Sequence, residues 1–237
     1  MTEGGHAGPF RRLALLTGAL AVFLALCALG LWQVQRLAWK TDLIARVEAR
    51  LAEAPAAAPG PADWPALSEP SDEYRRLSVT GSYAQDRDTL VKAVTTRGPG
   101  FWVMTPLVTP QGWTLLINRG FVPETARAAV PPPPPGDITL TGLMRLSQPG
   151  GGFLRKNKPQ TGRWFSRDTA AIADARGLGP VAPYFIDAEA RADADLPIGG
   201  LTVVSFRNSH LGYALTWFSL AALWAVWLIW LWRRPED

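Results

Sequence analysis

One histidine stands at the start of the most apolar stretch of the sequence. His210 precedes 211–232, a run without charge that contains five tryptophans. On a helix, the spacing of His210, Tyr213, Ala214 and Trp217 places them on one face. A neutral imidazole is the usual axial ligand of haem iron, and aromatic planes beside a small residue suit a flat macrocycle. The pattern therefore indicates a haem site, although a histidine that caps the helix or reaches the membrane interface explains the spacing as well.

Few other residues offer catalytic chemistry. The single cysteine, Cys27, excludes an intramolecular disulfide and a Cys-based metal site, and two histidines exclude a multi-His metal site within one chain. The sequence has neither a P-loop nor a GxGxxG motif. Ser166 and Lys156 would permit Ser–Lys catalysis, but nothing in their spacing supports it. We therefore do not predict an enzyme, and a membrane-anchored hydrolase stays the weakest reading.

Two apolar runs are long enough to span a bilayer. Residues 13–32 carry no charge and, as a helix, measure about 30 Å, the thickness of the hydrocarbon core. The run is longer than a typical signal-peptide core and lacks a clean cleavage site, which favours an uncleaved anchor. The second run, 211–232, is apolar all round, unlike a soluble helix. Both runs predict transmembrane helices.

Charges beside these runs predict the topology. Arg pairs lie immediately before the first run and after the second, so the positive-inside rule places both termini in the cytoplasm and the middle of the chain outside. Arg36, Lys40 and Arg46 argue the other way, but a long domain is translocated regardless of its charge. The pI of about 9.6 comes without a basic stripe, so we predict no nucleic-acid partner. The start of the chain lacks an Arg/Ser-rich transit peptide, so we expect a bacterial inner membrane with a periplasmic domain.

The middle of the chain reads as one β-rich domain. We expect this organisation: cytoplasmic N-terminus 1–12, transmembrane helix 13–32, amphipathic helical extension 33–51, Pro/Ala linker 52–70, extracytoplasmic β-rich domain 71–208, transmembrane helix 209–232 and cytoplasmic tail 233–237. Apolar and β-branched patterns predict strands over 74–83, 89–97, 101–109, 113–121, 138–146, 184–187 and 201–207. The fold class is a membrane protein with two helices flanking an α+β, mostly antiparallel, small barrel-like domain.

The sequence also predicts structural roles for several residues of the β-rich domain and of the first apolar run. Residues 168–176 should form a helix, with Ser166 or Asp168 as its N-cap and Gly177 as its end. Three glycines should permit turns or close strand approach, namely Gly81, Gly120 and Gly142. Arg119, and Arg167 with Asp168, are either buried pairs or contacts to haem propionates. In the first span, small residues at positions 14, 18, 21 and 25 would allow close contact with the second span or with another membrane protein.

A set of short motifs resembles the Surfeit locus protein one family nearly end to end. They are LGLWQVQR at 29–36, VTGSY at 79–83, TPL at 105–107, LINRGFVP at 116–123, TGLMR at 141–145, WFSRD at 164–168, APYFID at 182–187 and NSHLGYALTWF at 208–218. Each motif is short, but their order within a frame of two spans makes the set specific. At Leu154–Lys156 the chain lacks the proline typical of the family, so no contact is carried over to that loop.

The resemblance implies an assembly factor for cytochrome c oxidase that places haem a in the catalytic subunit. It implies His210 as the metal ligand, with Tyr213 and Trp217 lining a transient haem a site. The implied partners are the oxidase catalytic subunit, haem a synthase as a second candidate, and membrane lipid. A haem-free scaffold that stabilises the nascent oxidase subunit is the alternative. His6 is expected in the cytoplasm, so one chain offers a single histidine to a haem near His210.

Overall fold

The computed structural model describes residues 9–152, 155–190, 196–201 and 208–233. The predicted strand at 201–207 lies almost wholly outside the described residues. The chain divides into a helical unit, Met1–Arg46 with Ser205–Asp237, and a β-rich unit, Val47–Val204. Each unit is described by itself below.

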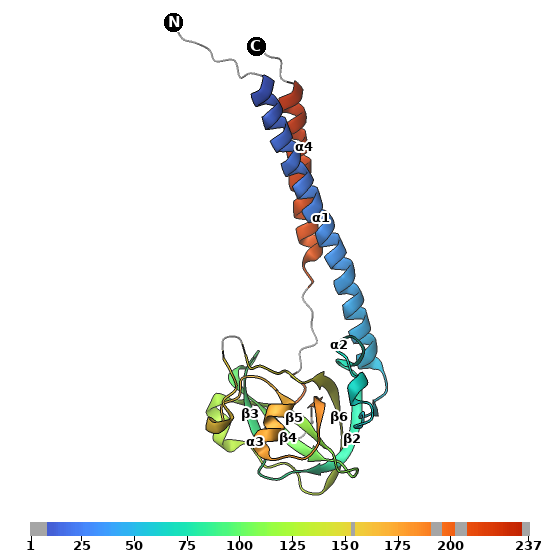
Figure 1. The fold of residues 1–237 in the computed structure, drawn as a ribbon, viewed down its shortest axis with the longest axis vertical. Coiled ribbons are helices and arrows are strands. Elements are labelled where there is room, and N and C mark those ends of the chain that lie inside the picture. Colours follow the sequence, from blue (N-terminus) through green and yellow to red (C-terminus); the bar gives the residue numbers. More distant parts are fainter. Residues whose placement is uncertain (1–8, 153–154, 191–195, 202–207, 234–237) are drawn as a thin grey trace. The chain divides into compact units, whose positions relative to one another are not determined.

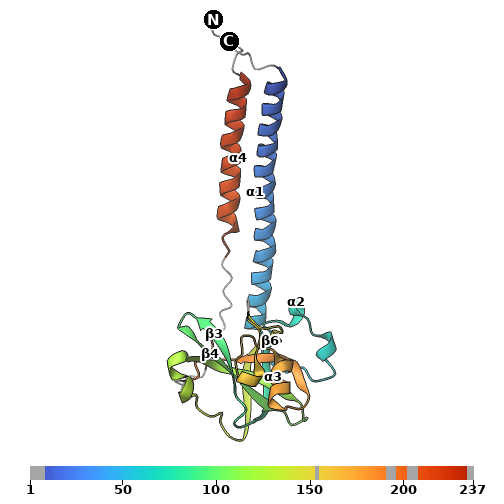
Figure 2. The same ribbon diagram turned by 60° about the vertical axis from the view of Figure 1, so that its left-hand side comes forward.

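Two long helices form the helical unit. Helix α1 runs over Pro9–Ala52 without interruption, and helix α4 runs over His210–Arg233. They lie side by side (Figures 1 and 2). Both are long and apolar enough to cross a membrane, over Leu13–Ala52 and His210–Trp230. The helical extension predicted for 33–51 is therefore the continuation of α1 itself.

Small residues allow the two helices to approach closely. Ala19 on α1 and Ala214 and Ala221 on α4 are buried, in helices whose other side chains are mostly exposed. At Gly30, an added Cβ would lie 2.6 Å from the Phe218 ring, so the ring occupies the space that a side chain would need. Dispersion contacts of this kind hold apolar helices together where lipid offers no hydrophobic driving force.

The small residues in contact differ from those that the sequence analysis proposed. A Cβ added at Gly18 would meet no atom within 4 Å, and the close contact with α4 uses Ala19 and Gly30 instead. The indole Nε1–H of Trp224 donates to the Ala19 carbonyl oxygen at 2.8 Å. A bulky α4 side chain thus reaches the α1 backbone only because residue 19 is small.

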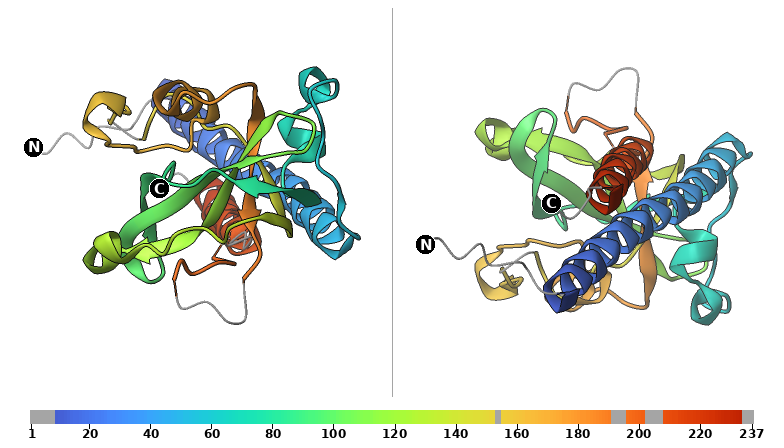
Figure 3. Two further views of the ribbon diagram at one scale, coloured as in Figure 1. Left: turned by 90° about the horizontal axis from the view of Figure 1, so that it is seen from below. Right: turned by 90° about the horizontal axis from the view of Figure 1, so that it is seen from above.

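Seven strands form one sheet in the β-rich unit. They are β1 Ala56–Ala57, β2 Arg76–Tyr83, β3 Thr89–Thr95, β4 Gly98–Val108, β5 Thr114–Pro123, β6 Asp137–Leu146 and β7 Val181–Ala188. Their order is β1-β2-β6-β7-β5-β4-β3, and β2 also pairs with β4, which closes β2, β6, β7, β5 and β4 into a small barrel (Figure 3). Five of the predicted strands are present within a few residues of their expected bounds, and 184–187 is the core of β7.

Strands β5 and β7 are buried on both faces. Leu115, Ile117, Tyr184 and Ile186 belong to one core cluster. The intervening residues Leu116 and Phe185 belong to a second cluster, which also holds Ile172 of helix α3 (Thr169–Arg176). Because neighbouring side chains of a strand point to opposite faces, β5 and β7 contribute to both clusters. The predicted helix 168–176 is confirmed, and Asp168 caps it by accepting from the Ala171 N–H.

The segment 52–70, which the sequence analysis takes as a linker, carries short elements. Strand β1 pairs in parallel with β2, and a 3₁₀ helix η1 (Trp64–Ala66) and helix α2 (Glu69–Asp72) follow. The Trp64 ring packs edge-on against Trp113 at 5.9 Å between centroids. The buried Tyr184 hydroxyl donates to the Pro59 carbonyl oxygen at 2.8 Å. One aromatic side chain and backbone acceptors suffice to attach this Pro-rich segment to the barrel.

Close strand approach explains two of the glycines. A Cβ at Gly142 would lie 2.3 Å from the Asp187 carbonyl oxygen, and one at Gly81 would lie 2.4 Å from the Val108 carbonyl oxygen. Both positions lie on strands at barrel pairings. The predicted structural role of these glycines is confirmed.

A buried ionic network joins three strands to the loops beside them. Asp187 on β7 contacts Arg145 at 3.2 Å and Arg167 at 3.1 Å, and it accepts from the Asn118 amide at 2.7 Å. Arg145 also pairs with Glu73 at 2.7 Å. Arg167 therefore pairs with Asp187, and the predicted partner Asp168 is wrong because its carboxylate caps α3.

Burial and neighbouring charges act in opposite directions on the two arginines of this network. Burial lowers the pKa of the Arg167 guanidinium, and the attraction of Asp187 offsets this only in part. Burial also disfavours charge on Arg145, but Asp187 and Glu73 outweigh it and raise the pKa of Arg145. Both guanidinium groups stay charged at neutral pH, so the Asp187 carboxylate is their essential partner.

Replacing Asp187 by Asn should lower the free energy of unfolding of the β-rich unit by about 3–5 kcal/mol, since it leaves buried guanidinium charge without its carboxylate. Glu189→Gln is the matched control, because Glu189 pairs with Arg76 at 2.7 Å in an exposed pair and should cost less than about 1 kcal/mol. Thermal unfolding of the full chain followed by circular dichroism measures both. Equal effects of the two changes would contradict the ranking.

Candidate functional site

His210 begins α4 and lies half-buried beside α1. Its Nδ1 is 2.7 Å from Oε1 of Gln33, a side chain that is only 8% exposed. An amide oxygen only accepts hydrogen bonds, so the imidazole Nδ1 carries the hydrogen in this pair. The two residues are 177 positions apart in the sequence and belong to the same helical unit.

This hydrogen bond fixes the chemistry of the second ring nitrogen. With Nδ1 protonated, the neutral imidazole has its lone pair on Nε2, which is the form that binds a metal. Histidines that bind metals regularly donate the other ring N–H to a carboxylate, a carbonyl or water, which orients the ring. Gln33 supplies an oxygen in that role. The arrangement therefore leaves the lone pair of the imidazole on Nε2.

Asn208, near the start of α4, has a buried oxygen atom that makes no hydrogen bond to the described residues. Asn208 donates from Nδ2 to the Thr41 hydroxyl at 3.5 Å, while its Oδ1 is buried and has no partner among the described residues. An unpaired buried acceptor is costly, because it loses water without a replacement. Asn208 thus offers an acceptor to a hydroxyl or N–H group, two residues from His210.

The predicted site residues on α4 differ in how exposed they are. Ala214, one turn after His210, is buried, whereas Tyr213 is 56% exposed. Trp217 is half-buried. The face that the sequence analysis assigns to one ligand is thus divided: Ala214 belongs to the buried part of the helix, and Tyr213 is accessible.

A haem fits this donor set through one protein ligand. His210 supplies its Nε2 nitrogen, Tyr213 and Trp217 supply aromatic surface, and Asn208 supplies an unpaired acceptor. Within the described residues, no group of three His, Cys, Asp or Glu side chains could hold a metal ion alone.

The other sequence candidates have structural partners. Arg119, with a side chain 8% exposed, pairs with Asp88 at 2.8 Å, so its predicted pairing is confirmed. The buried Ser166 hydroxyl accepts from the Gly151 N–H and from the Asn157 amide. These contacts hold a loop in place and include no base that would activate a nucleophile.

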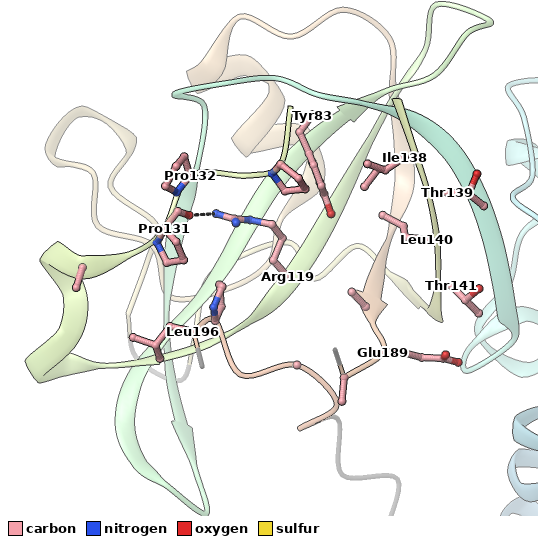
Figure 4. Close-up of a pocket in the computed structure, with 16 residues that line it drawn as sticks. Tyr83, Arg119, Pro131, Pro132, Ile138, Thr139, Leu140, Thr141, Glu189 and Leu196 are labelled. Atoms are coloured by element: carbon pink, nitrogen blue, oxygen red, sulfur yellow. Dashed lines mark hydrogen bonds between the residues drawn. The ribbon is translucent and has the colours of Figure 1, made fainter. Parts of the chain in front are cut away.

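A cavity lies in the β-rich unit, lined by residues of several strands and the loops beside them (Figure 4). Its volume is about 950 Å³, and Tyr83, Ile138, Leu140 and Leu196 are among its mostly apolar lining residues. Its arginine, Arg119, is neutralised by Asp88 and also donates to the Pro131 carbonyl oxygen at 3.0 Å. The Arg119 guanidinium of this cavity is thus already engaged, and His210, Tyr213 and Trp217 do not line it.

Sequence reasoning missed Gln33 and the unpaired atom of Asn208. Gln33 follows Trp32, where the predicted span ends, so it reads as the first polar residue outside the span. The available signal was its register: Gly30 and Gln33 are three residues apart and share a helix face. Only the pairing of α1 with α4 shows that this face meets His210.

Isotope-labelled histidine should show His210 as the Nδ1–H tautomer in the wild-type chain at neutral pH. Nuclear magnetic resonance of the ring nitrogens measures this, and His6→Ala leaves a single histidine signal. Gln33→Leu should remove the bias, because it removes the acceptor while keeping an apolar helix face. Gln35→Leu, on the exposed part of the same helix, is the control and should change nothing. An Nε2–H tautomer in the wild type would contradict the assignment.

Comparisons with known proteins identify the family. The model of the SURF1 family matches residues 20–222. The chain is 35% identical to a SURF1-like protein of Monosiga brevicollis over 231 residues, which covers 89% of this chain and 83% of that protein. It is 36% identical to Surfeit locus protein 1 of Mus musculus and of Homo sapiens, over 82% of this chain and 68% and 69% of those proteins. The match covers both helices and the barrel between them, so this chain belongs to the SURF1 family.

Proposed function

We propose that this chain is a membrane-anchored assembly factor for haem–copper cytochrome c oxidase that holds haem a at His210 and passes it to the catalytic subunit. The family membership supports the assembly role. The hydrogen bond from His210 Nδ1 to Gln33 Oε1 carries the haem proposal, since it leaves Nε2 available to iron. The helices anchor the protein in a bacterial inner membrane, with both termini in the cytoplasm and the β-rich unit in the periplasm.

Each residue of the site has a distinct task in this proposal. Gln33 orients the imidazole and holds the proton at Nδ1. His210 binds the haem iron through Nε2. Tyr213 and Trp217 cover part of the macrocycle, and the Asn208 oxygen accepts from a polar substituent of the haem. A single protein ligand suits a carrier, because the cargo must leave for another protein.

Haem a content of the purified chain tests the proposal. The full chain is made in cells that synthesise haem a, purified in detergent, and characterised by its optical spectrum. We expect a stoichiometric haem a band that His210→Ala abolishes or shifts, because the change removes the iron ligand. His6→Ala is the matched control and should retain the band.

A colourless wild type that still purifies with oxidase subunits would contradict the haem role and favour the scaffold. Loss of function on replacing Ser166 or Lys156, without loss of haem, would favour the hydrolase. Capture of the oxidase catalytic subunit is measured on the same samples, so the assembly role and the haem role are judged separately.

Helix separation should weaken haem retention without removing any ligand. Gly30→Leu places a side chain where the Phe218 ring lies, so the ring and the helix that carries it have to shift, which disturbs the His210–Gln33 hydrogen bond. We expect at least about a tenfold loss of haem affinity, the size typical of removing an outer-shell partner of a metal ligand. Gly18→Leu, at a position with open space, should retain haem in the same titration. Equal retention in both variants would show that helix contact does not matter for the site.

A further inference from the structure

A small cavity in the β-rich unit gathers positive charge around an aromatic floor. Its volume is about 380 Å³. Phe101 and Trp164, both buried, form the floor, and Lys92, Arg127, Arg155 and Arg163 line the walls. Glu124 is the one carboxylate among its lining residues.

The positive charge follows from the sequence of one long segment. Between Asp137 and Asp168 the chain contains no carboxylate side chain and six Lys or Arg residues. Arg145 and Arg167 are used in the buried network with Asp187. Arg155 and Arg163 are not, and the described residues place no carboxylate within salt-bridge distance of either or of Arg127.

The loop that carries Arg155 and Arg163, called the cationic loop below, is held against the sheet by backbone contacts. The Lys92 N–H donates to the Trp164 carbonyl oxygen at 2.8 Å, which joins the loop to edge strand β3. Lys158 and Arg163 pair across a turn at Pro159–Thr161. Asn157 Oδ1 accepts from the Phe165 N–H at 2.8 Å. The walls of the cavity are thus fixed by the fold.

Two guanidinium groups are held by aromatic rings. Arg127 Cζ lies 5.0 Å from the Phe101 ring centroid, and Arg155 Cζ lies 5.6 Å from that of Phe165. Cation–π contact of this kind orients the guanidinium plane, while its N–H edges stay free to bind both oxygens of a carboxylate. The only internal competitor described is Glu124, 3.6 Å from Lys92 in an exposed pair.

We propose that this cavity binds an acidic peptide segment of a partner protein. The carboxylate groups of such a segment match the forked N–H groups of Arg127 and Arg155. The CH₂ groups of its acidic side chains pack on Phe101 and Trp164. A membrane surface is flat and would contact cations on a protruding face, whereas these cations converge on a hollow. The inference does not rest on haem binding, because every residue of the cavity belongs to the β-rich unit.

Fluorescence anisotropy of a labelled hexaglutamate peptide tests this proposal on the full chain in uncharged detergent micelles. We expect binding that falls as salt rises, and no binding of a labelled hexaglutamine peptide. Arg127→Gln with Arg155→Gln should weaken the affinity about tenfold or more, since both carboxylate forks are lost. Glu124→Gln should strengthen it about two- to threefold by removing the competing charge.

Arg97→Gln with Lys156→Gln is the matched control. It removes the same charge from exposed positions outside the cavity and should change the affinity less than about twofold. Equal weakening by both double variants would overturn the proposal, because attraction would then be diffuse. Displacement by a water-soluble short-chain phosphatidylglycerol, with hexaglutamate no tighter than hexaglutamine, would also overturn it and assign the cavity to a lipid headgroup. Haem content is unaffected by these variants, so this result and that of the haem test remain distinct.

Discussion

A polar group buried among apolar helices needs a partner, and this requirement organises the helical unit. Gln33 and His210 satisfy each other at 2.7 Å, which a wider helix separation would not allow. The small residues Ala19, Gly30 and Ala214 provide that close approach. The Trp224 indole meets the same requirement by donating to the α1 backbone. The orientation of the imidazole thus depends on how closely the two helices pack.

In the β-rich unit, the buried groups that need partners are fully charged side chains. Asp187 lies at the centre of a network whose side chains are at most 14% exposed, and it joins Arg145 of β6 to Arg167 beyond the cationic loop. Burial of a charge is tolerated only when its partner is held in place. The network therefore fixes the position of Arg167 beside the sheet. Trp164 and Arg163 come shortly before it in the chain, so the network also helps to place them at the small cavity that Arg127 and Arg155 line.

Periodicity and turn chemistry predicted most elements, because both are local. The two long apolar helices follow from uncharged length, and helix α3 follows from Asp168 and Gly177, which cap it as expected. A barrel-like domain was expected, but the parallel pairing of β5 with β7 and the choice of β2 and β4 as the closing strands depend on distant segments, so strand patterns did not show them. Gln33 was missed for the same reason: its role depends on register with a helix 177 residues away. The attachment of 52–70 depends on Trp64 finding Trp113, which Pro-rich composition concealed.

A carrier has to bind its cargo firmly enough to hold it and weakly enough to release it. One histidine, oriented by a neutral amide, meets this condition better than a partner carboxylate would, because a carboxylate raises the basicity of the ring and strengthens the metal bond. Gln33 fixes the tautomer without adding charge to an apolar surrounding, where an unpaired carboxylate would be costly. In the proposed transfer, a second ligand offered by the receiving protein would have to outcompete only one bond. Docking through the β-rich unit would supply the proximity that this exchange requires, since a tethered ligand acts at high effective concentration.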